Sequence, residues 1–253
     1  MRSPLVVANW KMYGDQAQCA LLARQIVRAL RRDPAKANVV LAPPFTSLNA
    51  VHRSLSGSNV KLAAQNCHWE AQGAYTGEIS PNMVRELGCD YVIVGHSERR
   101  HLFHESNEMI ARKLAPIMSQ GMRAILCVGE TLDERQSIKT AAVIRRQLRI
   151  ALKGLTKTDI ANVEIAYEPV WAIGTGQNAT PKQISQVHSQ IRSCLRRWFG
   201  PAAAKLRILY GGSVKPENVD SLVAVEEING LLVGGASLKS ETFLPIIRAF
   251  SHK

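Results

Sequence analysis

Residues 163–201 read VEIAYEPVWAIGTGQNATPKQISQVHSQIRSCLRRWFGP, and this stretch has the pattern of one strand followed by one helix. The run from Val163 to Tyr167 is short and mostly apolar, which is typical of a strand buried on both faces of a parallel sheet. Thr180 to Gln183 then supplies an N-cap, a proline at the first helical position and a capping-box glutamine. The helix is predicted to end before Gly200 and Pro201, and its apolar face carries Ile184, Val187, Ile191, Leu195 and Trp198.

The same strand pattern occurs eight times along the chain, in runs of three to five residues. Segments with a helical period separate the runs: one opens at Asp15 and another is expected from Thr131 to Leu152. Strands alternating with helices, at about 32 residues per unit, predict a parallel sheet built from repeated strand–helix units. The eight predicted strands are Leu5 to Ala8, Val39 to Ala42, Val60 to Ala64, Tyr91 to Val94, Ala124 to Val128, Val163 to Tyr167, Leu206 to Tyr210 and Leu231 to Val233.

This repeated unit fits two architectures, a closed (β/α)8 barrel and an open doubly wound sheet. The open sheet usually carries a glycine-rich dinucleotide-binding turn after its first strand. Here the first strand is followed by Asn9-Trp10-Lys11-Met12-Tyr13-Gly14 instead. The length of 253 residues is typical of one barrel, and no linker or shift in composition divides the chain. We therefore predict a single closed parallel (β/α)8 barrel over residues 1–253.

Composition and charge exclude several classes of protein. Hydrophobic residues make up 46% and charged residues 21% of the chain, which excludes a mainly disordered protein. The net charge of +12 favours anionic partners. The five cysteines form no C-x-x-C pair and no zinc-ligand spacing, and their odd number argues against a disulfide framework. The apolar run that ends at Ala8 is too short for a signal peptide or a membrane span, so we expect a cytoplasmic protein.

Polar side chains follow several of the predicted strands, where the functional groups of such a barrel lie. Asn9 and Lys11 follow the first strand, and His96 and Glu98 follow the fourth. Glu168 ends the sixth run, where partial burial is expected to raise the carboxyl pKa toward that of a general base, although a solvated strand-end carboxylate fits this position equally well. His96 precedes a predicted helix, whose N-terminus disfavours a positive ring. A neutral His96 could donate to a carbonyl oxygen, and a structural histidine bonded to backbone is the alternative.

Two glycine pairs and one loop complete the predicted site. Gly211-Gly212-Ser213 follows the seventh strand and Gly234-Gly235 the eighth, the two positions at which barrels of this type often bind phosphate through backbone N–H groups. Tight turns also need glycine, but the coincidence of both pairs with these strand ends favours phosphate binding. The loop from Ala172 to Gly176 combines small residues with an apolar tip, which predicts a lid over Glu168.

Several segments in order resemble the triosephosphate isomerase family, and the resemblance runs nearly from end to end. It implies the TIM barrel fold and the interconversion of dihydroxyacetone phosphate and glyceraldehyde 3-phosphate through an enediolate. The segments that carry it are Asn9-Trp10-Lys11, Gly73-Ala74-Tyr75-Thr76-Gly77-Glu78-Ile79-Ser80, Gly95-His96-Ser97-Glu98-Arg99-Arg100, Ala166 to Gly176, Tyr210-Gly211-Gly212-Ser213 and Leu232 to Leu238.

The resemblance also implies roles for individual residues. Glu168 would move the proton between the two carbons, while His96 and Lys11 stabilise charge on the oxygens. Asn9 would orient the substrate and Glu98 would pair with Lys11. The substrate phosphate would be held by backbone N–H groups, and two apolar side chains would cover the base. The phosphate-binding residues so implied are Gly174, Ser213, Gly234 and Gly235, and the covering side chains are Ile173 and Leu232.

Three further expectations concern cofactors, partners and assembly. The reaction needs only a base, an electrophile and the exclusion of water, so no metal or organic cofactor is expected. The segment around Tyr75 and Thr76 resembles the family's dimer loop, which implies a homodimer in which this loop inserts beside Asn9 and Lys11 of the partner subunit. We expect neither a nucleic acid nor a membrane as a partner.

One position departs from the family pattern. The family usually has Asp before the glycine of the last strand, and this chain has Asn229 before Gly230. The usual ion pair with Arg192 would become a hydrogen bond to a neutral acceptor. We expect this difference to affect stability near the lid rather than activity.

Two other functions remain alternatives. One is a different phosphate-binding barrel, such as another aldose–ketose isomerase or a sugar-phosphate aldolase, but a Schiff-base aldolase needs a desolvated lysine inside the barrel. The only lysine in the predicted strands is Lys61, which lies near the start of its strand, the wrong end. The second is a basic nucleic-acid or surface-binding protein, suggested by residues 145–149. Their helical spacing is typical of a solvated face, and no nucleic-acid motif accompanies them.

Overall fold

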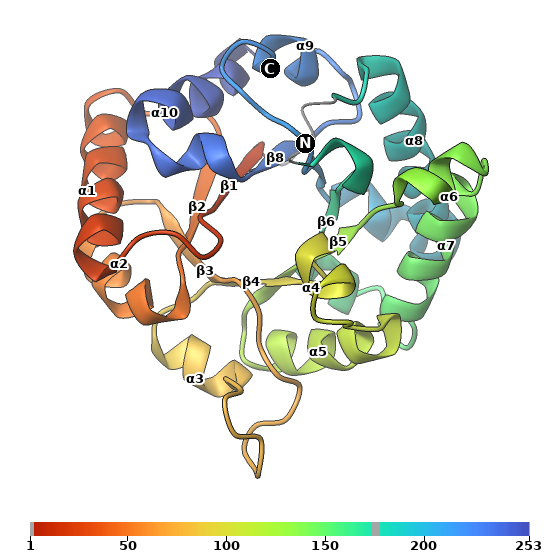
Figure 1. Cartoon of the computed structure of the whole chain (residues 1–253), viewed down its shortest axis with the longest axis horizontal. Helices are drawn as coiled ribbons and strands as arrows, with labels where there is room; N and C mark the ends of the chain where they lie inside the picture. Colours follow the sequence, from red (N-terminus) through yellow and green to blue (C-terminus); the bar gives the residue numbers. More distant parts are fainter. Residues whose placement is uncertain (1–2, 174–177, 253) are drawn as a thin grey trace.

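The computed structural model describes residues 3–173 and 178–252, and in these residues parallel strands close into one barrel in the order β1 to β8 (Figure 1). Each strand pairs with the next in sequence, and β1 pairs with β8 to complete the closure. The prediction of a closed (β/α)8 barrel is therefore confirmed. The strands are β1 Leu5–Asn9, β2 Asn38–Ala42, β3 Lys61–Ala64, β4 Tyr91–Val94, β5 Arg123–Val128, β6 Val163–Tyr167, β7 Ile208–Tyr210 and β8 Gly230–Val233.

Helices surround the barrel and cover its outer face (Figure 1). Both capping predictions are confirmed: Asp15 forms a capping box with Gln18, and Thr180 forms one with Gln183. No helix within the described residues is long and apolar enough to cross a membrane. The α-helices are α1 Gln16–Arg32, α2 Leu48–Ser54, α3 Pro81–Glu86, α4 Ser97–His101, α5 Asn107–Ser119, α6 Leu132–Gln136, α7 Thr140–Ala151, α8 Pro181–Phe199, α9 Val219–Val223 and α10 Ser240–Arg248. The 3-10 helices are Phe45–Ser47, Asp159–Asn162, Val170–Ala172, Gly200–Lys205, Gly235–Leu238 and Ala249–His252.

The prediction of one continuous helix from Thr131 to Leu152 is wrong, because the structure has two helices there. Thr131 does cap a helix, but α6 ends at Gln136 and α7 begins at Thr140. Between them Ile138 has a φ of +57°, the left-handed region, which breaks the helical path. The side chain of Ile138 is 92% exposed, so no packing offsets this conformation.

Replacing Ile138 by glycine is expected to stabilise the protein. An L-residue in the left-handed region costs about 1–2 kcal/mol, and a β-branched side chain is least suited to it. Glycine removes that cost but loses about 0.5–1 kcal/mol through its larger unfolded-state entropy. We expect Ile138→Gly to raise Tm by about 1–3 °C in calorimetry. The matched control is Ile138→Ala, and an alanine variant as stable as the glycine variant would contradict this explanation.

The core has two layers that follow the alternation of side chains along the strands. In β1, Leu5 and Val7 point into the barrel, whereas Val6 and Ala8 pack toward the helices. The barrel interior is filled by Leu5, Val7, Val40, Ala42, Ala63, Tyr91, Ile93, Ile125, Cys127, Ala166, Leu209 and Leu232. A filled interior leaves no pore, so any ligand site must lie at an end of the barrel.

The amino-terminal end of the barrel is closed by a buried ionic cluster. Glu164 in β6 is fully buried, and its Oε1 lies 2.6 Å from Arg123 Nη2 and 2.9 Å from Arg207 Nη1. The Arg207 N–H donates to Oε2 of the same carboxylate. These bonds satisfy the one charged residue in a strand that otherwise carries apolar or aromatic side chains. The opposite, carboxyl end of the barrel remains for the site.

Candidate active site

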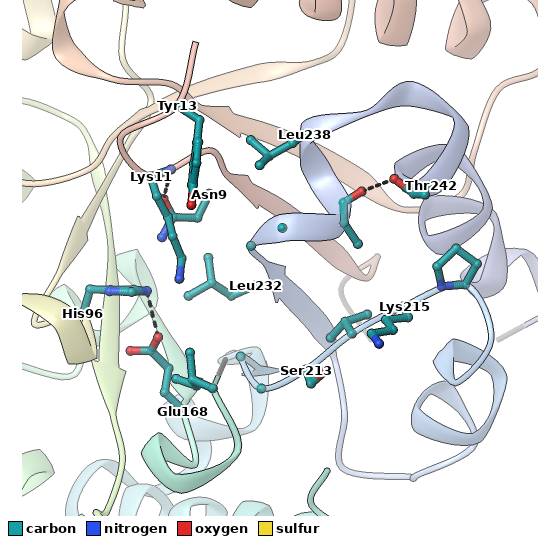
Figure 2. Close-up of a pocket in the computed structure, with 18 of the residues that line it drawn as sticks. Asn9, Lys11, Tyr13, His96, Glu168, Ser213, Lys215, Leu232, Leu238 and Thr242 are labelled. Carbon is teal, nitrogen blue, oxygen red and sulfur yellow. Dashed lines mark hydrogen bonds and ion pairs between the residues drawn. The ribbon is translucent and has the colours of Figure 1, made fainter. Parts of the chain in front are cut away.

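The predicted site residues that the structure describes surround one cavity of about 540 Å³ at the carboxyl end of the barrel (Figure 2). Each comes from the end of a strand or from the loop directly after it. This convergence agrees with the sequence prediction for most of the named positions, although Glu98 contacts Lys11 without lining the cavity itself. The lining includes Asn9, Lys11, His96, Glu168, Ile173, Ser213, Leu232, Gly234 and Gly235.

Glu168 lies directly after β6 and is almost completely buried. Its Oε1 lies 3.0 Å from His96 Nε2 (Figure 2). Its Oε2 accepts a 3.0 Å hydrogen bond from the Ser97 N–H. Glycine at 211 leaves room for this side chain, because a Cβ there would lie 2.9 Å from Glu168 Cγ. Glycine is needed at position 129 as well, because a Cβ added there would lie 1.7 Å from the Glu168 carbonyl oxygen.

The predicted direction of the Glu168 pKa is wrong for this arrangement. Burial raises the pKa of Glu168, as expected, but the neighbouring His96 ring, the Ser97 N–H and the Cys127 thiol together lower it more. The pKa of this carboxyl therefore lies below its usual range. The apolar run before Glu168 predicts that the carboxyl is buried. It does not predict the hydrogen-bond donors, His96 and Ser97, that follow β4 and lower the pKa.

His96 follows β4 and caps helix α4. Its Nδ1 accepts the Glu98 N–H at 3.3 Å, so a proton on Nδ1 would place two donors face to face. Nδ1 is thus an acceptor and Nε2–H the donor to Glu168, which is the hydrogen-bond pattern of an uncharged ring above its pKa. Burial lowers the pKa of His96, but the adjacent Glu168 carboxylate outweighs burial and raises it, opposite to the direction predicted from the helix terminus alone.

Lys11 is held over the cavity by its own backbone and by an acidic partner. Its φ is +51°, and its N–H donates to Asn9 Oδ1 at 3.0 Å. Its Nζ lies 2.7 Å from Glu98 Oε1, which confirms the predicted pairing geometrically. A non-glycine residue in the left-handed region at a cavity is typical of a functional constraint. The cation is therefore positioned rather than freely solvated.

The two glycine pairs have different structural reasons. A Cβ at Gly212 would lie 2.1 Å from the Tyr210 hydroxyl oxygen, so Gly211 and Gly212 are required by packing. A Cβ at Gly235 would meet nothing within 4 Å, which leaves its backbone accessible from the cavity. A Cβ at Gly234 would lie 3.3 Å from Lys11 Cε. The second pair thus fits the prediction of close ligand approach better than the first.

Ile173 and Leu232, the predicted covering side chains, both line the cavity. Leu232 belongs to the barrel interior, and Ile173 is half-buried at the end of the described part of the loop. Gly174, the fourth predicted phosphate-binding residue, lies outside the described residues, as do Thr175 and Gly176, the rest of the predicted lid. Among residues 3–173 and 178–252, no group of three or more His, Cys, Asp or Glu side chains is placed to hold a metal ion.

Comparison with known proteins identifies the family. Residues 4–250 match the family model for triosephosphate isomerase. The chain belongs to the triosephosphate isomerase family. It is 50% identical over 249 residues to the triosephosphate isomerase of Syntrophotalea carbinolica, covering 98% of both chains. It is 47% identical over 248 residues to that of Caldanaerobacter subterraneus subsp. tengcongensis, covering 98% of this chain and 99% of the relative. It is 48% identical over 250 residues to that of Prosthecochloris aestuarii, covering 98% of both.

Two residues that support this triosephosphate isomerase site were not predicted from the sequence. The Gln65 amide donates to the carbonyl oxygens of Lys11 and Ala42, each at 2.8 Å, and so fixes the strained loop after β1. Arg100 donates from Nε to the Gly95 carbonyl at 2.7 Å and from Nη2 to the Cys127 carbonyl at 2.9 Å. Arg100 appears in the sequence as one of two adjacent arginines on a helix, a pattern that predicts a solvated face.

Arg100 is expected to position His96 and Glu168. It joins the residue before His96 to β5 through the Gly95 and Cys127 carbonyl oxygens, and Asn107 Oδ1 accepts from its Nη1 at 2.7 Å. Because lysine cannot reproduce three bonds from one planar group, Arg100→Lys should lower kcat about 10-fold with little change in KM. Asn107→Ala removes only the bond from Arg100 Nη1 and should lower kcat by a smaller factor. Equal kcat values for Arg100→Lys and the wild type in steady-state kinetics would contradict this role.

The structure corrects the expected location of Asn229. It precedes β8, so it lies at the amino-terminal end of the barrel, away from the cavity and the predicted lid. Its Oδ1 accepts from Arg192 Nη2 at 2.7 Å, which is the predicted neutral hydrogen bond, and also from the Ile208 N–H. Arg192 gains a charged partner elsewhere, because Glu227 Oε2 lies 3.3 Å from its Nε. The missing Asp is therefore partly replaced by Glu227.

Proposed function

We propose that this member of the triosephosphate isomerase family interconverts dihydroxyacetone phosphate and D-glyceraldehyde 3-phosphate by proton transfer through an enediolate. The observation that carries the proposal is the pairing of the Glu168 carboxylate with His96 Nε2 at 3.0 Å inside one cavity. That cavity also contains a positioned cation, Lys11, and an accessible glycine backbone at Gly235. A base, a neutral hydrogen-bond donor, a cation and a phosphate-sized backbone cradle are the groups that this reaction requires.

Glu168 is the proposed base. In the ligand-free arrangement both of its carboxylate oxygens accept hydrogen bonds, one from the ring of His96 and one from the Ser97 N–H. Substrate binding would give His96 Nε2–H a new acceptor, the substrate carbonyl oxygen, and would free Glu168 Oε1. Glu168 then takes the proton from one carbon of the substrate and returns it to the neighbouring carbon. The hydroxyl proton moves from one substrate oxygen to the other, which His96 Nε2 is proposed to assist as the donor to these oxygens. Loss of the His96 contact also removes an interaction that lowers the Glu168 pKa, which makes the carboxylate a stronger base.

The negative charge of the enediolate and the phosphate is proposed to be stabilised by Lys11, which Asn9 and Glu98 hold in position. The ammonium of Lys11 stabilises the developing enediolate oxygen and the substrate phosphate. The Asn9 side chain holds the Lys11 backbone through the 3.0 Å bond to its N–H. Glu98 keeps the ammonium in place through the 2.7 Å contact between Lys11 Nζ and Glu98 Oε1.

The phosphate group is proposed to bind at the ends of β7 and β8. Ser213, Gly234 and Gly235 line that side of the cavity, and the proposed fourth residue is Gly174. Ile173 and Leu232 would exclude water from Glu168, which strengthens the electrostatic interactions around the intermediate. The reaction as proposed uses no metal and no organic cofactor.

Assays with three kinds of substrate test this function. The proposal expects rapid conversion of dihydroxyacetone phosphate to glyceraldehyde 3-phosphate. It expects neither aldol cleavage of a ketose bisphosphate nor isomerisation of a pentose phosphate. Trapping with borohydride separates the aldolase alternative, because Lys11 is ion-paired and a Schiff base needs a neutral amine. Covalent labelling of Lys11, or turnover of the pentose phosphate alone, would refute the proposal.

We further propose that two copies of the chain associate through the segment that carries Tyr75 and Thr76. This segment projects away from the barrel between β3 and α3 (Figure 1). Tyr75 is partly exposed although its ring stacks on His68 at a centroid distance of 4.3 Å. Other exposed large apolar side chains, including Tyr13 and Phe103, follow β1 and β4 at the same end of the barrel. Residues 1–253 would form one catalytic domain of a cytoplasmic homodimer.

Charging the projecting segment is expected to separate the subunits. Tyr75→Asp would bury an unpaired carboxylate at the contact, which favours the monomer. A monomer in which Lys11 and its loop lose a neighbour should be about 10-fold less active. Sedimentation at micromolar concentration measures the first effect, and Tyr75→Phe serves as the control that keeps the ring. A monomeric wild-type protein, or a Tyr75→Asp variant that sediments as a dimer, would refute this assembly.

A further inference from the structure

A second cavity lies at the amino-terminal end of the barrel, the end opposite to the proposed active site. Its volume is about 740 Å³, and it lies between helix α2, the end of α3 and the first residues of β3 and β4. Its polar lining includes His52, Arg53, Ser56, Lys61, Arg85 and Asp90, and these six residues define what we call the basic groove. None of them takes part in the site described above.

The charge of the basic groove is strongly asymmetric. Arg53 comes from α2, Lys61 from β3 and Arg85 from α3, so three elements place three permanent cations around one space. Asp90 is the one carboxylate in the lining, and His52 adds a further titratable nitrogen. Cations held together in this way repel one another and raise the local positive potential. A ligand with at least two negative charges would relieve that repulsion.

The single carboxylate is already engaged. Asp90 Oδ1 lies 3.4 Å from Lys61 Nζ, and Oδ2 accepts the Leu62 N–H. Arg85 donates from Nη1 to the Cys89 carbonyl oxygen, which fixes its side chain without neutralising it. Within the described part of the chain, no carboxylate lies within 4.0 Å of the Arg53 or Arg85 guanidinium. Two arginines are therefore left for an external anion.

The walls of the groove are held by packing. Gly88 has a φ of +84°, and a Cβ at this position would lie 2.2 Å from His52 Nδ1. The His52 ring thus lies against the bare backbone of residue 88, and its place depends on glycine there. Buried Leu55, Val60 and Leu62 form an apolar floor beneath the charged rim. A volume of this size falls in the range of metabolite pockets, about 300–1,000 Å³, and exceeds what one phosphate ion fills.

We propose that the basic groove binds a small molecule with linked phosphate groups, a polyphosphate or an organic polyphosphate, at a site separate from the active site. Arg53 and Arg85 each carry a planar guanidinium that can match two phosphate oxygens, and Lys61 adds a point charge to the same cavity. The spread of these groups over α2, β3 and α3 selects a ligand with more than one phosphate. The inference does not depend on the proposed isomerase reaction.

Calorimetric titration of the full-length protein with tripolyphosphate tests the proposal. Saturating glycerol 3-phosphate is present throughout, so that the active-site cavity is already filled with a phosphate ligand. We expect one binding event per chain whose affinity falls as salt rises. We also expect inorganic phosphate to bind at least about 10-fold more weakly than tripolyphosphate, since it can contact fewer of the cations.

Two variants localise the binding event. Arg53→Gln combined with Arg85→Gln should weaken tripolyphosphate binding at least about 10-fold, since charged hydrogen bonds to phosphate are lost. Ser56→Glu keeps every cation but places a carboxylate in the groove, and it should weaken binding as much. The matched control, Arg145→Gln with Arg149→Gln, removes the same charge from exposed positions of α7 and should leave binding unchanged. Retained secondary structure and Tm confirm that each variant is folded.

Several outcomes would overturn the proposal. Equal weakening in the groove and α7 variants would show attraction to net charge alone. Tripolyphosphate binding that appears only in a parallel titration without glycerol 3-phosphate would place tripolyphosphate in the active site. Tight binding of a single-stranded oligonucleotide that the groove variants abolish, without any binding of tripolyphosphate, would assign the surface to nucleic acid instead.

Discussion

Glu168→Asp is expected to lower kcat about 100-fold with a much smaller change in KM, because a carboxylate withdrawn by about 1 Å misses the substrate carbon. The backbone cannot move to compensate. The Glu168 N–H donates to the Val128 carbonyl, and the Gly211 N–H donates to the Tyr167 carbonyl, so both neighbouring strands hold residue 168. The close approach of Gly129 to the Glu168 carbonyl oxygen leaves no space for a shift.

A matched control distinguishes a carboxylate that no longer reaches the substrate carbon from a general effect of the substitution on the cavity. Glu217 lines the same cavity but is exposed, and Glu217→Asp makes the same chemical change there. Steady-state kinetics should give this control a nearly normal kcat. A Glu168→Asp variant with kcat within about threefold of the wild type would remove Glu168 from the role of base.

His96→Ala is expected to lower kcat about 10²–10³-fold, the usual cost of removing one donor to a developing oxyanion. It should also shift the pH profile. His96 is the main group that lowers the Glu168 pKa, whereas burial raises it. Without His96 the Glu168 pKa rises, so the carboxylate becomes protonated at a higher pH in the free enzyme. The acid limb of the kcat/KM profile should therefore move to higher pH.

The pH profile separates this role of His96 from a structural one. His101 lies in the same short helix and is exposed, so His101→Ala should leave both kcat and the acid limb unchanged. A His96→Ala variant that loses activity while its acid limb stays in place would show that His96 does not set the Glu168 pKa in solution.

The fold could be predicted from sequence because its signals are local. The capping box at Thr180, the proline after it and the apolar period of α8 all lie within one segment, and the eight strands repeat the same short run. The break at Ile138 could not be predicted in this way. Its left-handed backbone has no glycine or asparagine to signal it, so the sequence pattern indicated one continuous helix.

The residues of the site could be predicted from the sequence, but the direction of their pKa shifts could not. Strand ends identify Glu168 and His96, because every strand of the barrel places its carboxyl end at the same face. The Glu168 pKa depends on a donor 71 residues away in sequence, Ser97, which no local pattern connects to it. The roles of Gln65 and Arg100 could not be predicted for the same reason, because both side chains donate hydrogen bonds to backbone carbonyl oxygens of distant segments.

The isotope content of the product shows whether a protein base carries the proton between the two carbons. The wild-type protein would convert dihydroxyacetone phosphate in D2O, and the glyceraldehyde 3-phosphate would be removed at once by oxidation and analysed by mass spectrometry and NMR. The carboxyl group of protonated Glu168 exchanges its proton with solvent, so we expect solvent deuterium at C2 of the product. A product that carries no solvent deuterium at C2 would indicate direct hydride transfer between the carbons and would exclude proton transfer through an exchanging Glu168.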